Sequence, residues 1–138
     1  MTKKTINDFG VGDSASFTKT ITEADILMFG AVSGDFNPAH FDEEYAKTTQ
    51  FKSRIAHGMI TASLLSGVMG MQLPGPGTIY MKQELKFMAP VYAGNTVTAK
   101  VEVIEVILEK GRLRLKTTCT NQEGKVVVDG EALVMAPR

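Results

Sequence analysis

The chain has 138 residues, the length of one ordinary domain, and its fifteen basic side chains balance fifteen acidic ones. That balance gives no bulk electric field to draw the protein onto nucleic acid or an anionic membrane, so neither is an expected partner. The one cysteine, Cys119, excludes an internal disulfide and any multi-thiolate metal cluster. We expect a single domain over residues 1–138, and a cytoplasmic location because the first residues lack the apolar run of a signal peptide.

The first third of the chain predicts one strand and two helices. Residues 14–20, SASFTKT, are typical of a short edge strand. Thr22 opens a Thr-x-x-Asp capping pattern ahead of the apolar run ILMFGAV, which predicts a helix that ends at Gly34. Residues 42–47 predict a second, short helix with Asp42 as its N-cap, because acidic residues fill the first turn and a lysine follows.

Residues 57–72 predict a long helix with two unlike faces. Because a glycine inside a helix costs up to about 1 kcal/mol relative to alanine, a stripe of small residues indicates that another backbone or a ligand comes close. The apolar segment 59–73 is shorter than the ~20 residues that span a bilayer, so we expect a buried helix that ends at LPGPG. The bulky stripe is Ile60, Leu64, Val68 and Met71, and the small stripe is Ser63, Ser66, Gly67 and Gly70.

The remainder of the chain reads as strand. Four segments, within residues 78–88, 96–109, 112–120 and 125–135, predict an antiparallel meander. In the second segment the apolar residues change parity after Val103, and such a change predicts a bulge or strong bend in a long strand. The fold class is therefore α+β, with a sheet that covers the helix at 57–72.

The stretch GDFNPAHFD, residues 34–42, places Asp35 five residues before His40. An imidazole and a nearby carboxylate can hold and activate one water near neutral pH. The spacing alone equally fits a structural Asn-Pro turn in which Asp35 bonds the backbone. His57 and Gly58 raise a second option, because the free N–H groups at a helix start can receive a developing oxyanion, although a plain helix-entry glycine fits the same pattern.

Other chemistries have little support in the sequence. Two histidines, His40 and His57, do not stand at metal-ligand spacing, so we expect no metal. No serine lies in a G-x-S-x-G elbow, and Cys119 falls on an alternating strand, where a buried and inert thiol is expected. Glycine-rich nucleotide-binding loops are absent from the sequence.

The segments SGDFNPAHFD, FKSRIAHGM and ASLLSG together resemble the MaoC-like, (R)-specific enoyl-CoA hydratases, and the similarity continues through LPGPGTIY, LKFMAPVYAG and VTAKVEV. The resemblance implies a hot-dog fold, an antiparallel sheet wrapped around a long central helix, in a protein that forms homodimers. It also implies the reversible, cofactor-free addition of water to a trans-2-enoyl-CoA thioester to give an (R)-3-hydroxyacyl-CoA, a hydro-lyase reaction of fatty acid metabolism.

The same resemblance implies a role for five residues. Asp35 and His40 match the catalytic acid and histidine, and the backbone N–H of Gly58 matches the donor to the thioester carbonyl. Ser66 matches a supporting serine, and Asn37 matches the asparagine of the motif. The alternatives are a 3-hydroxyacyl-acyl-carrier-protein dehydratase, a hot-dog thioesterase and a non-catalytic acyl-CoA-binding protein. A thioesterase is disfavoured because residues 57–72 carry no acid.

Overall fold

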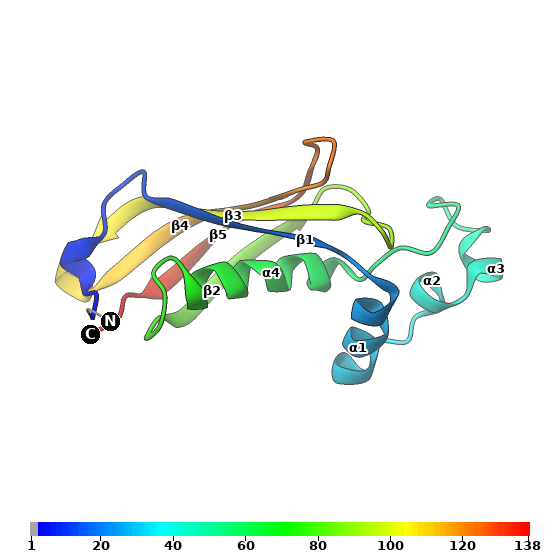
Figure 1. The fold of residues 1–138 in the computed structure, drawn as a ribbon, viewed down its shortest axis with the longest axis horizontal. Helices are drawn as coiled ribbons and strands as arrows, with labels where there is room; N and C mark the ends of the chain where they lie inside the picture. The colour runs from blue at the N-terminus through cyan, green and yellow to red at the C-terminus, as the bar shows by residue number, and fades with distance from the viewer. Residues whose placement is uncertain (1–2) are drawn as a thin grey trace.

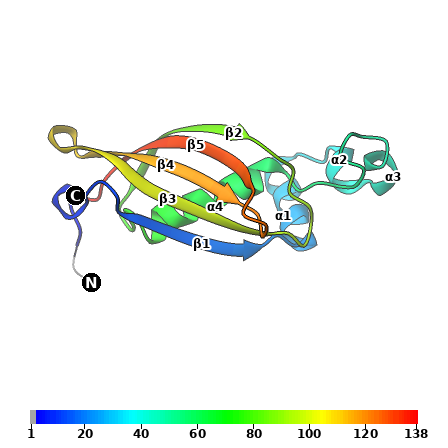
Figure 2. The same cartoon turned by 90° about the horizontal axis from the view of Figure 1, so that it is seen from above.

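The computed structural model describes residues 3–138, in which five antiparallel strands form one curved sheet (Figures 1 and 2). The strands lie in the order β1-β3-β4-β5-β2. The predicted edge strand at residues 14–20 is confirmed, since β1 pairs with β3 on one side alone among the described strands. The bounds are β1 Ser14–Thr20, β2 Ile79–Phe87, β3 Thr96–Ile107, β4 Arg112–Thr120 and β5 Val126–Met135.

Helix α4, Gly58–Met71, runs along one face of the sheet and is wrapped by it (Figures 1 and 2). The predicted bulky stripe faces the sheet at Ile60, Leu64 and Val68, which are buried, but not at Met71, which is exposed at the C-terminal end of the helix. Leu65, which the stripe did not include, is fully buried in the same core as Val101 of β3. Buried and more exposed residues alternate along β3 and β4, and the buried side chains of these strands form the other side of this core. The α+β class and the hot-dog arrangement are confirmed.

The predicted meander is wrong at its first strand. Strands β3, β4 and β5 follow one another as hairpins, but β2 pairs with β5 at the far edge and not with β3. The reason is that residues 88–95 do not form a tight turn. Val91 accepts a hydrogen bond from Ala56 N at 2.7 Å, and Gly94 N donates to Ile21 O at 2.7 Å, so this connection crosses the end of the sheet and returns the chain beside β1.

The predicted irregularity in the long strand is confirmed. The register of β3 against β4 shifts between Val103 and Glu105. Residues 97, 99, 101 and 103 are all buried, and after the shift the strand is only partly covered. A short 3-10 helix, η2 Leu108–Lys110, then closes the turn to β4, while η1 Ile6–Asp8 precedes β1.

Three helices lie beyond one end of the sheet (Figure 1); the caps of α1 and α3 agree with the sequence, whereas α2 was not predicted. Helix α1, Glu23–Ser33, begins with the Thr22 capping box and ends at Gly34, whose φ of 78° is the left-handed value that favours glycine. Helix α2, Pro38–Phe41, is capped by Asn37, and α3, Glu43–Ala46, by Asp42. We call α2, α3 and the loop to residue 55 the overhang.

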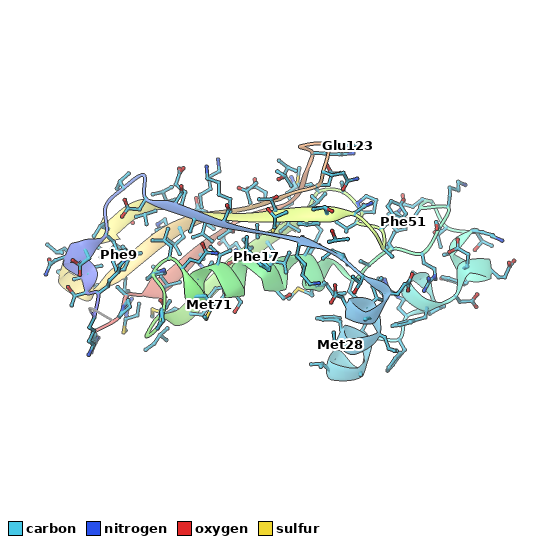
Figure 3. All side chains as sticks on the ribbon, in the orientation of Figure 1. Phe9, Phe17, Met28, Phe51, Met71 and Glu123 are labelled. Atoms are coloured by element: carbon cyan, nitrogen blue, oxygen red, sulfur yellow. The ribbon has the colours of Figure 1, made fainter. Side chains whose placement is uncertain are left out.

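The small stripe of α4 faces away from the sheet and is exposed. Residues 63, 66, 67 and 70 all lie on this side, together with Met59 and Met71. Met71 is 76% exposed and Met28, on α1, also projects from the surface, as Figure 3 shows. In the part of the chain that the structure describes, no helix has the length and apolar character needed to cross a bilayer.

Candidate active site

Asp35 stands in the loop between α1 and α2, where local hydrogen bonds shape the backbone. Its N–H donates to Ser33 Oγ at 3.1 Å, and its Oδ1 accepts from the N–H of Asn37 at 3.1 Å. Asn37 Oδ1 in turn accepts from Ala39 N at 3.0 Å, which starts α2. The Asp35 side chain remains 47% exposed, so its second carboxylate oxygen is free to meet a ligand.

His40 comes from α2 and faces Asp35. Its Nδ1 lies 2.7 Å from the carbonyl oxygen of Ile55, and because a carbonyl can only accept, this nitrogen carries the ring proton. In the neutral ring Nε2 therefore presents a lone pair, and it lies 4.0 Å from Asp35 Oδ2. That distance is too long for a direct hydrogen bond, but it suits two groups that share one water.

The segment 55–58 passes beside this pair and then starts α4. Ile55 supplies the acceptor for His40, His57 is the N-cap residue, and Gly58 is the first helical residue. The first N–H groups of a helix have no partner within it, and among the described residues no side chain caps them here. Their positive dipole end suits an oxyanion.

An apolar pocket of about 290 Å³ opens next to Gly58. The pocket is bounded by the end of β2, the loop that follows it, and the first turns of α4, and it does not include Asp35 or His40. The 55–58 segment contacts both His40 and the pocket, because Ile55 accepts a hydrogen bond from His40 and also lines the pocket with Ala56 and Gly58. The pocket is lined by Phe51, Ile55, Ala56, Gly58, Thr61, Phe87, Met88, Ala89, Pro90, Val91 and Val128.

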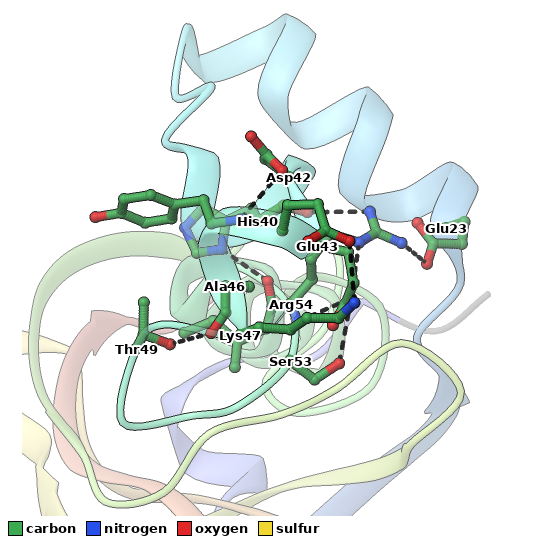
Figure 4. A network of polar contacts seen from close by, with 12 residues as sticks. Glu23, His40, Asp42, Glu43, Ala46, Lys47, Thr49, Ser53 and Arg54 are labelled. Carbon is green, nitrogen blue, oxygen red and sulfur yellow. Dashed lines mark hydrogen bonds and ion pairs between the residues drawn. The ribbon is translucent and has the colours of Figure 1, made fainter.

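Arg54 ties the overhang to the site, a role that the sequence did not suggest (Figure 4). Its Nη1 donates to the backbone oxygen of His40 at 3.2 Å, and its Nη2 to Glu23 Oε1 at 2.6 Å. Its Nε lies 3.6 Å from Glu43 Oε2. The side chain of Arg54 thus contacts α1, α2 and α3. In the sequence Arg54 appears only as a single arginine in FKSRIAHGM, which does not indicate these contacts.

The structure brings together some of the predicted site residues and not others. Asp35, His40 and Asn37 lie in one loop and helix start, and Gly58 follows within the adjoining segment. Ser66 lies on the exposed face of α4, and within residues 3–138 its hydroxyl makes no hydrogen bond to Asp35 or His40. Its supporting role stays a prediction, as do the catalytic roles of Asp35 and His40, the oxyanion role of Gly58 and the supporting role of Asn37.

His57 lies close to Asp35 and His40, although the sequence indicated only that it stands at the start of a helix. Ligand atoms of Asp35, His40 and His57 lie within 4.8 Å of one another. One nitrogen of each ring is already engaged by a backbone carbonyl, however, and the two rings are stacked. Stacked rings direct their lone pairs side by side rather than toward a common centre, so the arrangement favours hydrogen bonding over metal ligation.

Cys119 is buried on β4, as predicted for an inert thiol. Its Sγ donates to Thr61 O at 3.7 Å, and burial raises the pKa of the thiol to about 12. Because the thiolate is the nucleophilic form, this residue takes no part in chemistry near neutral pH.

The fold and the site together define a hot-dog protein with an acid and an imidazole beside the start of its central helix. The chain belongs to the family described as MaoC like domain, whose profile matches residues 8–126. It is 55% identical over 130 residues to an (R)-specific enoyl-CoA hydratase of Rhodospirillum rubrum, covering 94% of this chain and 90% of that one. The family resemblance drawn from the motifs is confirmed.

Two further relatives agree with this assignment. A 3-hydroxybutyryl-CoA dehydratase of Methylorubrum extorquens is 47% identical, with 95% of this chain and 83% of the relative covered. The solved structure of the unliganded R-hydratase PhaJ1 from Pseudomonas aeruginosa superposes with a TM-score of 0.91 at 49% identity, covering 99% of this chain and 87% of that one.

Proposed function

We propose that the protein is an (R)-specific enoyl-CoA hydratase, a hydro-lyase of fatty acid metabolism that adds water reversibly to a trans-2-enoyl-CoA. The observation that carries the proposal is the 4.0 Å separation between Asp35 Oδ2 and His40 Nε2, the nitrogen left unprotonated in the neutral ring because Nδ1 donates to Ile55 O. Two proton acceptors at this distance can hold one water between them. The similarity to an (R)-specific enoyl-CoA hydratase over most of both chains supports the same reaction.

The proposed mechanism begins with the thioester carbonyl at the N–H of Gly58. Asp35 or His40 removes a proton from the shared water while the oxygen of that water bonds to C3 of the substrate. The electron pair of the C2–C3 double bond moves toward the thioester carbonyl, whose oxygen gains negative charge. A well-placed donor typically stabilises such an oxyanion by about 2.7–4 kcal/mol. A proton delivered to C2 then completes the addition, and the reverse sequence expels water.

The apolar pocket suits the substrate's carbon chain. It lies next to Gly58, so a thioester held at that N–H can place apolar atoms among side chains such as Phe51 and Val91. Specific pockets of this kind are mostly apolar with few polar groups. The alternative carrier is an acyl carrier protein, and a thioesterase stays disfavoured because α4 carries no acidic residue.

The experiment that tests the proposal follows crotonyl-CoA hydration through the loss of enoyl absorbance, with chiral analysis of the product. We expect (R)-3-hydroxybutyryl-CoA at a rate far above buffer. A series of enoyl-CoA and enoyl-carrier-protein substrates of rising chain length then identifies the carrier. Formation of the (S) product, or thioester cleavage without hydration, would sink the proposal.

We also propose a homodimer joined along β2. This strand has one free edge among the described strands, and apolar residues at and near it are exposed, namely Ile79, Tyr80, Met81, Phe87 and Met88. The neighbouring small face of α4 is exposed as well. Pairing of two β2 edges would satisfy the open backbone groups and cover these side chains.

Sedimentation velocity at micromolar concentration tests the dimer. We expect twice the chain mass of 15.0 kDa, and Met81→Lys should shift the equilibrium toward monomer, whereas Phe17→Lys on the opposite edge should not. A wild-type monomer would contradict the proposal.

A cytoplasmic location stays a prediction too. A free buried thiol suits a reducing compartment, and cell fractionation would check the location.

A further inference from the structure

His57 is a buried histidine that makes contact with both proposed acid/base residues. Its Nε2 lies 2.9 Å from the backbone oxygen of Asp35, and its ring stacks on that of His40 with centroids 3.9 Å apart. The rings of Phe29 and Phe41 pack around it, at 4.8 and 5.7 Å. Only 2% of the residue is exposed, so substrate does not reach it directly.

These contacts fix the tautomer of His57. The carbonyl of Asp35 can only accept, so Nε2 carries the ring proton and Nδ1 has the lone pair. Within residues 3–138 this Nδ1 is buried and has no hydrogen-bond partner. A buried polar atom without a partner is disfavoured and calls for an explanation, because an apolar ring would fill the same space without that penalty.

The bond to Asp35 is the long-range restraint on the Asp35 loop. The other bonds of Asp35, to Ser33 and Asn37, join residues two positions away and move with the loop. The bond from His57 spans 22 positions and connects the loop to the start of α4. The stacked face of the same ring limits how His40 can turn, and Gly58 follows directly in the chain.

We propose that His57 is a positioning residue that holds Asp35 by its backbone carbonyl and His40 by its ring face. It thereby keeps the carboxylate, the imidazole and the Gly58 N–H in one fixed arrangement. The proposal rests on the proposed hydration activity. A displacement of about 1 Å in a reacting group can cost ~10²-fold in rate, so loss of this restraint should lower kcat rather than weaken binding.

Three variants separate the contacts. His57→Phe keeps an aromatic ring against His40 but removes the donor, whereas His57→Gln carries an amide N–H near the position of Nε2. Phe29→Leu loosens the packing around the ring and leaves the groups of the hydrogen bond to Asp35 and of the stack on His40 unchanged. We expect His57→Phe to lower kcat for crotonyl-CoA by ~10²-fold with KM changed less than about threefold. His57→Gln should keep at least about a tenth of the wild-type kcat, and Phe29→Leu should stay within about threefold.

Two measurements do not depend on activity. Nitrogen-15 spectra of the histidine rings should show His57 protonated at Nε2 in the wild type. Calorimetry should give the same affinity for the unreactive thioester butyryl-CoA in wild type and in His57→Phe. If His57→Phe fails to fold, the tautomer and the rate of His57→Gln still test the proposal.

The outcomes are distinct. A wild-type protein that does not hydrate crotonyl-CoA contradicts the proposed function, whatever the variants do. An active wild type with an equally active His57→Phe, or with His57 protonated at Nδ1, overturns the positioning role. The same holds if Phe29→Leu loses as much kcat as His57→Phe, because packing alone would then explain the effect.

Discussion

A methyl group added at Gly58 would lie 2.6 Å from the Phe87 ring, closer than side chains tolerate. Gly58 therefore has a steric reason to be glycine that is separate from its backbone N–H. Phe87 also lines the apolar pocket, so any shift of its ring changes the space available to the substrate. The helix start at Gly58 could be predicted from the sequence. The contact of Gly58 with the Phe87 ring, 29 positions further along the chain, could not, because it depends on the tertiary fold.

We expect Gly58→Ala to lower kcat/KM for crotonyl-CoA by at least about tenfold, since the methyl group displaces Phe87 and crowds the approach to the N–H. Adding Phe87→Ala should restore part of the loss. Gly10→Ala is the matched control, because nothing lies within 4 Å of its added methyl group and its φ is not positive. Equal rates for Gly58→Ala and Gly10→Ala would show that close approach at Gly58 is unimportant.

The residues that carry the proposed chemistry differ in how far the sequence revealed them. Asp35, Asn37 and His40 lie within six consecutive positions, so their spacing was visible as a motif. The contacts of His57 and Arg54 join residues 11 to 31 positions apart, so they form only when the chain folds back on itself. Local spacing has no information on such contacts.

At the scale of elements, Arg54 is the polar link among three short helices. Helices α2 and α3 have four residues each, too few to be stable alone. Their placement therefore depends on caps and on Arg54, which reaches His40 O, Glu23 and Glu43. The acidic partners are substantially exposed, so solvent weakens these ion pairs.

Arg54→Met should keep the packing of the side-chain stem and lose all three polar contacts. We expect a loss of about 1 kcal/mol in unfolding free energy, together with faster hydrogen exchange confined to residues 38–47. Activity should fall because His40 is held less firmly. Lys47→Met removes an exposed pair with Glu44 on the same overhang and should change stability by less than about 0.5 kcal/mol. Unchanged exchange in Arg54→Met would contradict the role of this link.

The elements themselves were largely predictable. Helix caps at Thr22, Gly34 and Asp42 follow from residues within one turn, and strand bounds follow from alternation. Strand order was the exception: residues 88–95 resemble a hairpin connection, but they bind Ala56 and Ile21 and cross the sheet. These long-range contacts determine which strands pair with each other, and the alternation of apolar residues along a strand gives no information on them.

For the whole molecule, the fold accounts for how a short loop is held in the position that the proposed active site requires. The sheet buries the bulky face of α4 and so fixes the position of its first turn. Ile55 then holds His40 beside that turn, and His57 holds the backbone of Asp35 there. Among the described strands β2 has one unpaired edge, and this edge and the exposed face of α4 form the surface that the proposed dimer would cover.

In the proposed mechanism Asp35 and His40 together activate one water, and crotonyl-CoA hydration by Asp35→Asn and His40→Gln tests this joint role most directly. Each substitution removes a proton acceptor at the 4.0 Å gap, so kcat should fall by ~10²–10⁴-fold with the fold retained. Asp42→Asn is the matched control, because asparagine caps α3 as well as aspartate does. Near wild-type rates in both Asp35→Asn and His40→Gln would contradict the mechanism.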